Sequence, residues 1–300
     1  MVYKITHRRR KTRKSSKRRK YVRRQKGGQN KEVAVFNFYN KYHYGDHILN
    51  LKFLYNISNH LKDKNIKINY YYDPTYIKNL DEVQRYVNPD IVTLLPLEEQ
   101  YRPPSTEHPE NRHELWMRYD IDGISYKKFD TYYSAFYNKI LNILGLQNLS
   151  IDTSIYQKED YLLDIYEKLD SKYKDVDILI INGKPNSNQF DYDKEKMDAM
   201  CIRLAGKYKV ATTILVNDTI PCTMSDGLKM QDIGAISTHA KYIIAVHTGP
   251  ITTCCNSYTK ASVKIWFVLC NQIDFIHEQI NFKQIKDSNS LEQIDSQISI

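Results

Sequence analysis

The stretch with the clearest capacity for chemistry is a turn, His247-Thr248-Gly249-Pro250, which follows a short apolar run. Gly249 lets another backbone approach closely, and Pro250 suits the first turn of a helix. The free N–H groups of such a turn point at whatever lies above the sheet edge, and they favour an anion. We therefore expect a phosphate here. The alternative is an ordinary strand-to-helix connection that needs Gly and Pro only for its geometry.

Two further turns contain residues with complementary chemistry. Gly45-Asp46 supplies a carboxylate, and Asn182-Gly183-Lys184 supplies a cation. All three turns are expected at the carboxyl ends of parallel strands, where open α/β sheets bind ligands. A carboxylate in one half that faces phosphate-binding turns in the other would suit group transfer from a nucleotide-activated donor. One group would take the acceptor's proton, while N–H groups and a cation would stabilise the diphosphate that leaves.

Each of these residues also has a simpler interpretation. Asp46 could serve only as a helix cap, because Asp is among the favoured capping residues. Lys184 could be a solvated loop lysine, and His247 could pack at a strand end rather than bind a phosphate or a base. Asp120 and Asp122 have the spacing of a metal-binding carboxylate pair, but the same spacing recurs in the chain by composition. We expect no metal site.

Apolar runs alternate with helical patterns along both halves, and this order predicts parallel sheets with helices on their faces. Loops as long as the polar segment 98–112 tend to be functional or mobile. In the first half we expect strands at 32–39, 66–72, 90–95 and 115–117, and helices at 46–61, 76–86 and 129–144. In the second half we expect strands at 177–182, 210–216, 242–246 and 263–269, and helices at 157–169, 193–205, 228–240, after 249, and at 274–285.

This pattern predicts an α/β fold of two Rossmann-like domains facing across a cleft. The expected divisions are a basic tail at 1–31, an N-terminal domain at 32–150, a C-terminal domain at 151–286 and a frayed end at 287–300.

Composition separates the tail from the body. Residues 1–31 hold 15 of the 44 Lys and Arg and no Asp or Glu, so the rest of the chain has 29 basic against 35 acidic residues, a net −6. We expect the tail to be disordered and to make weak contact with nucleic acid or an anionic surface, or to act as an import or packaging address. The alternative is a solubilising arm without a specific partner.

Two further patterns concern the compartment. No apolar run approaches the roughly 18 residues of a membrane span, and the basic start lacks the apolar core of a secretory signal. The five cysteines form no C-x-x-C pair, so we expect buried thiols in a reducing compartment and no zinc site. The sequence therefore predicts an intracellular protein without a transmembrane segment.

Over residues 32–270 the chain resembles the GT-B glycosyltransferases, and within them the heptosyltransferase-like group, glycosyltransferase family 9. Tyr44-Gly45-Asp46-His47-Ile48 is similar to the group's N-terminal Gly-Asp turn, whose Asp acts as general base on the acceptor hydroxyl. Val246-His247-Thr248-Gly249-Pro250 is similar to its Asp-Thr-Gly-Pro turn, which holds the donor diphosphate at a helix N-terminus. Lys184 lies roughly where the family often has a basic residue near the diphosphate.

The resemblance implies an inverting glycosyltransferase that uses no cofactor and moves a sugar from a nucleotide-diphosphate donor to a hydroxyl acceptor. The N-terminal domain would bind the acceptor and the C-terminal domain the nucleotide sugar. The sequence departs from the family where His247 replaces its Asp and where residues 251–256 replace its small-residue stretch. The implied roles are Asp46 as catalytic base, Lys184, His247, Thr248 and Gly249 on the diphosphate, and Gly45, Gly183 and Pro250 for loop geometry.

The basic start and the abundance of Tyr, Asn, Ile and Lys are similar to proteins of large DNA viruses. This likeness implies a location in the host cytoplasm or the virion, with nuclear entry through the tail. It also supports a second hypothesis, a non-catalytic nucleic-acid- or virion-associated protein that acts through residues 1–31. Deleting the tail would abolish function under that hypothesis and spare catalysis under the first. A nucleotide-binding hydrolase or epimerase on the same fold is a third hypothesis, because fold does not fix reaction.

Overall fold

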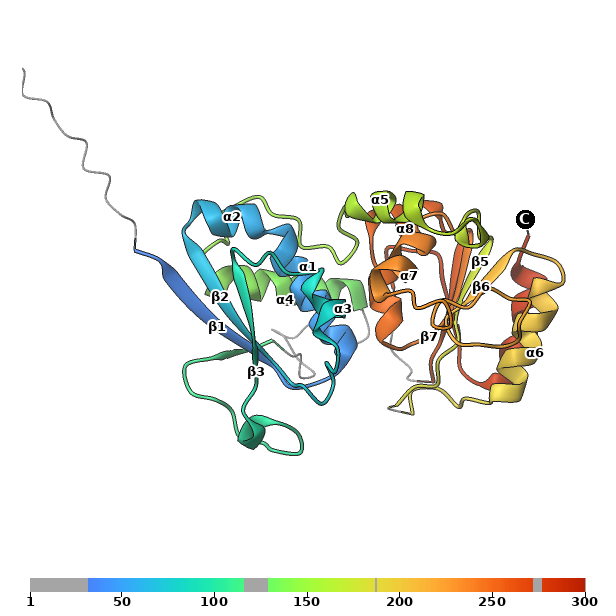
Figure 1. The fold of residues 1–300 in the computed structure, drawn as a ribbon, viewed down its shortest axis with the longest axis horizontal. Helices are drawn as coiled ribbons and strands as arrows, with labels where there is room; N and C mark the ends of the chain where they lie inside the picture. The colour runs from blue at the N-terminus through green and yellow to red at the C-terminus, as the bar shows by residue number, and fades with distance from the viewer. Residues whose placement is uncertain (1–31, 116–128, 187, 272–276, 300) are drawn as a thin grey trace, which may run out of the picture. The chain divides into compact units, whose positions relative to one another are not determined.

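The computed structural model describes residues 32–115, 129–186, 188–271 and 277–299 (Figure 1). The predictions for the basic tail, for Trp116 and Met117, and for Asp120 and Asp122 lie outside the described residues.

The first sheet is built from the N-terminal half. Its strands β1 (Ala34–Asn40), β2 (Ile66–Tyr72), β3 (Val92–Pro96) and β4 (His113–Glu114) are all parallel and lie in the order β3-β2-β1-β4. The helices of this half are α1 (Tyr44–Asn56), α2 (Ser58–Asp63), α3 (Leu80–Gln84) and α4 (Phe129–Ile143), and the loop after β3 contains a 3₁₀ turn, η1 (Glu99–Tyr101). The predicted strands 32–39, 66–72 and 90–95 are confirmed to within two residues.

The second sheet is built from the C-terminal half. Its strands β5 (Ile178–Ile181), β6 (Val210–Thr212), β7 (Tyr242–Val246), β8 (Ile265–Leu269) and β9 (Phe282–Ile285) are parallel and lie in the order β6-β5-β7-β8-β9. The helical elements are α5 (Tyr161–Lys168), η2 (Ser171–Tyr173), α6 (Lys194–Ala205), α7 (Met230–Ser237), η3 (Gly249–Cys254), α8 (Ser257–Ser262) and η4 (Ser288–Gln297).

Helices cover both faces of the second sheet, which explains why its central strands are continuous apolar runs (Figure 1). Alternate residues of β7 point to opposite faces: Ile243 and Ala245 pack in the core that includes residues of α7, while Ile244 packs with Met197 and Met200 of α6. The two parallel sheets with flanking helices confirm the predicted α/β fold. The cleft stays a prediction.

The end of the chain differs from expectation. The predicted helix 274–285 is wrong for its last part, because Phe282–Ile285 forms the edge strand β9 beside β8. The predicted fraying from 287 is also wrong: Leu291 and Ile294 of η4 are buried, and the Asp287 carboxylate accepts hydrogen bonds from the first N–H groups of this helix. Apolar residues at helical spacing thus find a partner surface, which is α6.

Two other expectations bear on the framework. All five cysteines are free and buried, as predicted. Within the described ranges, none of the helices has both the length and the apolar character that crossing a membrane would require.

Candidate functional site

The sheet order determines where ligands should bind. In the second sheet β5 and β7 are neighbours, and the chain leaves β5 into α6 on one face while it enters β7 from α7 on the other. Such a switch point opens a crevice at the carboxyl ends of the two strands. The turns Asn182-Gly183-Lys184 and His247-Thr248-Gly249-Pro250 follow these two ends, so the topology brings both predicted phosphate-binding turns to one edge.

Two glycines bring the third predicted turn onto this edge. A Cβ atom added at Gly45 would lie 3.1 Å from Cγ2 of Thr252 and 3.2 Å from Cα of Gly249. A Cβ atom at Gly249 would in turn lie 3.3 Å from Cδ1 of Tyr44 and 3.6 Å from the Gly45 nitrogen. The backbones of α1 and η3 therefore touch at their first turns. A Cβ atom at either position would be closer to its neighbours than an ordinary van der Waals contact, so the absence of side chains favours this approach. It places the Asp46 turn against the Thr248-Gly249 turn.

Asp46 lies in the first turn of α1 with its carboxylate 26% exposed. The capping interpretation is wrong, because the N-cap is His43 and no side chain caps this helix. Instead, the Tyr133 hydroxyl of α4 donates a hydrogen bond to Asp46 Oδ1 at 3.0 Å. His43 Nδ1 lies 3.7 Å from Asp46 Oδ2, and the interaction with this carboxylate raises the pKa of His43. The carboxylate thus has one fixed partner and one titratable partner.

From the sequence alone, the spacing of Tyr133 relative to Phe136 and Tyr137 indicates only a core position on its helix. Its ring is indeed buried, and burial raises the pKa of its hydroxyl well above the usual value, with Asp46 adding to the effect. The hydroxyl therefore stays protonated and acts as a donor. A tyrosine among Phe and Leu at core spacing was the available signal, since a buried Tyr hydroxyl usually finds a hydrogen-bond partner.

His247, at the end of β7, is held near the same carboxylate. The ring of Phe129 meets the His247 ring edge-on, with centroids 5.7 Å apart. Burial, together with a smaller effect of nearby His277, lowers the pKa of His247 to about 4, while Asp46 acts in the opposite direction. His247 is therefore a neutral imidazole at pH 7, which can form a hydrogen bond to a ligand without adding a positive charge.

Thr248 and Gly249 present backbone donors at the start of η3. Within the described ranges, the structure gives neither N–H an acceptor. The Thr248 hydroxyl donates to the Val246 carbonyl at 3.2 Å and does not cap the helix. Pro250 occupies the first turn, as predicted, where its missing N–H costs nothing. These donors lie beside Gly45, one residue from Asp46.

The turn after β5 is built differently. Asn182 is buried, and its side chain joins the ends of β5 and β6: Oδ1 accepts from the Ile214 N–H at 2.8 Å, and Nδ2 donates to the Ile214 carbonyl at 3.0 Å. Lys184 is exposed and forms no hydrogen bond or ion pair with another described residue. A Cβ atom at Gly183 would meet only Ile214 Cγ1, at 3.7 Å. The turn keeps Lys184 at the ligand edge without fixing it.

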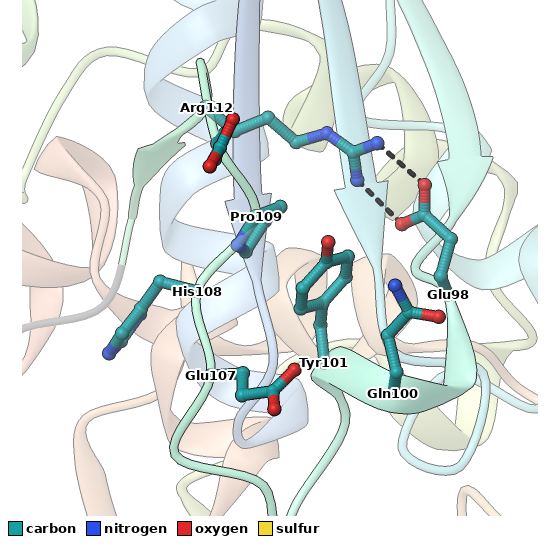
Figure 2. A pocket seen from close by; sticks show the side chains of 8 residues that line it. Glu98, Gln100, Tyr101, Glu107, His108, Pro109 and Arg112 are labelled. Atoms are coloured by element: carbon teal, nitrogen blue, oxygen red, sulfur yellow. Dashed lines mark hydrogen bonds and ion pairs between the residues drawn. The ribbon is translucent and has the colours of Figure 1, made fainter.

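A pocket of about 510 Å³ lies elsewhere, in the long loop 98–112 (Figure 2). Arg112 and Glu98 form a two-point ion pair on its wall, which lowers the pKa of the Glu98 carboxyl. The loop is anchored to β1, because Tyr39 Oη lies 2.6 Å from His108 Nδ1. None of the predicted site residues lines this pocket. The loop 98–112 therefore forms a separate pocket beside the first sheet.

The described residues contain no group of three or more His, Cys, Asp or Glu side chains able to hold a metal ion.

Comparison with known proteins identifies the fold. No protein-family model matches the sequence, and no curated protein is significantly similar to it. Among solved structures, E. coli heptosyltransferase WaaC with ADP-2-deoxy-2-fluoro heptose aligns over 88% of this chain and 99% of that chain, at 8% identity and a TM-score of 0.53. A glycosyl transferase family 9 structure from Veillonella parvula DSM 2008 aligns over 89% of each chain, at 15% identity and a TM-score of 0.44. The likeness to the heptosyltransferase structure, together with the two parallel sheets, shows a GT-B-like α/β fold.

Proposed function

We propose that this protein is a glycosyltransferase that moves a sugar from a nucleotide-diphosphate donor to a hydroxyl acceptor. The observation that carries the proposal is the contact between Gly45 and Gly249, which brings a carboxylate near two backbone N–H groups that have no acceptor among the described residues. The fold shared with a heptosyltransferase supports the same function. A carboxylate beside N–H donors at a switch point suits a reaction that removes a proton and releases an anion.

The proposed reaction is a single in-line displacement with inversion and without a cofactor. The acceptor oxygen attacks the anomeric carbon while Asp46 takes the hydroxyl proton. The bond between that carbon and the phosphate oxygen breaks, and the diphosphate leaves with the electron pair. The N–H groups of Thr248 and Gly249 bind the departing diphosphate, neutral His247 forms a hydrogen bond to it, and Lys184 adds a positive charge.

Asp46→Asn tests the base directly, because it keeps the side-chain shape and the hydrogen bond from Tyr133. We expect the transfer rate to fall by about 10²- to 10⁴-fold, the range for removing a general base. Donor affinity should stay within about twofold, since the binding groups belong to the other turn. Full transfer activity in the variant would rule out Asp46 as the base. Asp63→Asn, at the exposed end of α2 just before β2 begins, serves as the matched control.

The nucleic-acid-binding hypothesis gives the opposite pattern. In that case neither substitution would change function, and binding would weaken steeply with added salt. The net −6 of residues 32–300 argues against a broad nucleic-acid surface on the body.

A further inference from the structure

We propose that Lys52 is a positioning residue: together with Glu159 it fixes helix α1 against η3 and so holds Asp46 in register with the Thr248-Gly249 turn. This inference rests on the proposed function, and it concerns a buried ion pair outside the turns assigned to the reaction.

Lys52 and Gly45 lie on the same face of α1, seven residues apart. Gly45 contacts the start of η3, as described above. At the other end of η3, Lys52 Nζ donates hydrogen bonds to two backbone carbonyl oxygens, that of Thr252 at 3.3 Å and that of Cys255 at 3.1 Å. The last carbonyls of a helix lack partners within it, and a cation is favoured there. Helix α1 is therefore held to η3 at two points, one steric and one electrostatic.

Glu159 completes the arrangement from the segment before α5. Its Oε1 lies 2.7 Å from Lys52 Nζ, and the two side chains are 4% and 1% exposed. The Tyr161 hydroxyl donates to Glu159 Oε2 at 2.6 Å. Removing both charges from water is costly, and apolar residues of similar volume often stabilise a core equally well. A buried pair with this many partners is therefore suited to fixing one geometry rather than to adding stability.

The segment that contains Glu159 is hydrogen-bonded both to α1 and to α8, the helix that follows η3. Asn56, at the end of α1, donates to the side-chain oxygen of Gln157. The backbone carbonyl of Gln157 accepts from the Ser257 N–H of α8 at 3.0 Å. Residues 157–159 thus join α1 to the elements that follow the donor turn, and the Lys52–Glu159 pair is the charged centre of this junction.

The consequence for transfer follows from this placement. The donor-binding N–H groups belong to η3, whereas the base belongs to α1. If the junction loosens, the diphosphate can still bind but the base is misplaced, and small displacements of a catalytic group cause large losses of rate. The Lys52→Met/Glu159→Leu double variant removes both charges and retains apolar volume, so we expect it to fold.

Kinetics on the full chain provide the first test. We expect the double variant to lower kcat at least about tenfold and to leave the donor Kd within about twofold. Lys194→Met, which removes a partly exposed ion pair with Asp198 on α6, should change neither value. A folded double variant with the kcat of the unmodified protein would overturn the proposal.

Native cysteines provide a second test that needs no substrate. Cys254 and Cys255 are buried at the end of η3, near Lys52, while Cys201 lies on the buried face of α6. Burial raises the pKa of Cys254 and Cys255, so both react slowly with alkylating reagents. Mass spectrometry after native alkylation should show faster labelling of Cys255 in the double variant, with Cys201 unchanged.

The two tests separate the inference from the function on which it rests. Equal acceleration at Cys201 would mean that the pair contributes only to global stability, and unchanged labelling of Cys255 would mean that the junction did not loosen; either result overturns the proposal. An unmodified protein that transfers no sugar, together with selective labelling of Cys255 in the variant, would instead reject the proposed function and retain the junction.

Discussion

The turn after β1 and the turn after β5 look alike in the sequence but differ in the structure. Each combines a glycine with a charged residue: Gly45 with Asp46, and Gly183 with Lys184. Gly45 is in contact with the Gly249 backbone, and Asp46 accepts a hydrogen bond from a buried tyrosine. Gly183 has room for a side chain, and Lys184 is exposed. The first turn is therefore a fixed part of a junction, while the second can adjust to a ligand.

The largest expected difference between the two turns comes from adding one methyl group to each glycine. Gly45→Ala should destabilise the protein by about 1–3 kcal/mol, because the new Cβ meets backbone that cannot move easily. Gly183→Ala should change stability by less than about 0.5 kcal/mol. Urea denaturation monitored by circular dichroism measures both. Equal losses in the two variants would mean that the contact at Gly45 is not tight.

Low pH should destabilise the region of the turn after β1 and have no such effect at the turn after β5. His47 is fully buried in α1, and burial lowers its pKa to about 3, whereas the turn 182–189 contains no histidine. The unfolded chain binds a proton near pH 6.5 and the folded chain does not, so stability is complete above about pH 6.5 and falls as the pH decreases toward 3. The expected slope for this group is about 1.4 kcal/mol per pH unit.

His47→Gln tests this prediction by removing the titration. The free energy of unfolding of the variant should depend less on pH between 6.5 and 4 than that of the unmodified protein. The pKa of partly exposed His43 is raised, so its effect on stability has the opposite sign to that of His47. Its contribution to the free energy of unfolding is lost as the pH rises through that pKa. If the two proteins showed parallel pH curves, His47 would not be held neutral by burial.

Tyr133→Phe separates the position of the carboxylate from its presence. Losing the hydrogen bond at 3.0 Å should lower kcat about tenfold, corresponding to the roughly 1.4 kcal/mol of one hydrogen bond to a charged group. Tyr132→Phe is the matched control because it removes a hydroxyl from the neighbouring residue of the same helix. Identical kcat losses in both variants would indicate a general effect of helix α4.

The smallest effect is expected at the second turn. Lys184→Gln should weaken diphosphate binding by up to about fivefold, the range of a solvent-exposed charge interaction, and the difference should shrink as salt is added. Stability should not change, since Lys184 is exposed and forms no hydrogen bond or ion pair with a described residue. A loss of more than 100-fold in affinity would mean that Lys184 is as fixed as Asp46.

The strands and turns of the fold could be predicted from the sequence where a local pattern of residues indicates them. Continuous apolar runs such as Tyr242–Val246 mark buried parallel strands, and the glycine turns follow them. The edge strand Phe282–Ile285 was missed because only its two end residues are apolar. The helix η4 was missed because a mostly polar stretch becomes ordered only through its contact with α6.

The site was less predictable, because its contacts join distant parts of the chain. The residue types of Gly45 and Gly249 indicated close approach, but not that each approaches the other. The position of Tyr133 in its helix indicates a core residue, and Lys52 has the residue type of an ordinary helix surface. Their roles depend on which acceptor lies opposite, and no local pattern contains that information.

We propose that a nucleotide diphosphate binds at Thr248 and Gly249, facing Asp46. Thermal unfolding of the full-length protein with a panel of nucleoside diphosphates and their sugars tests this most directly. At 100 times its Kd, one ligand should stabilise the protein by about 2.7 kcal/mol. The shift should persist in added salt and in Gly183→Ala, and it should disappear in folded Gly249→Val. A folded protein that no member of the panel stabilises, or a shift that survives Gly249→Val, would contradict the account.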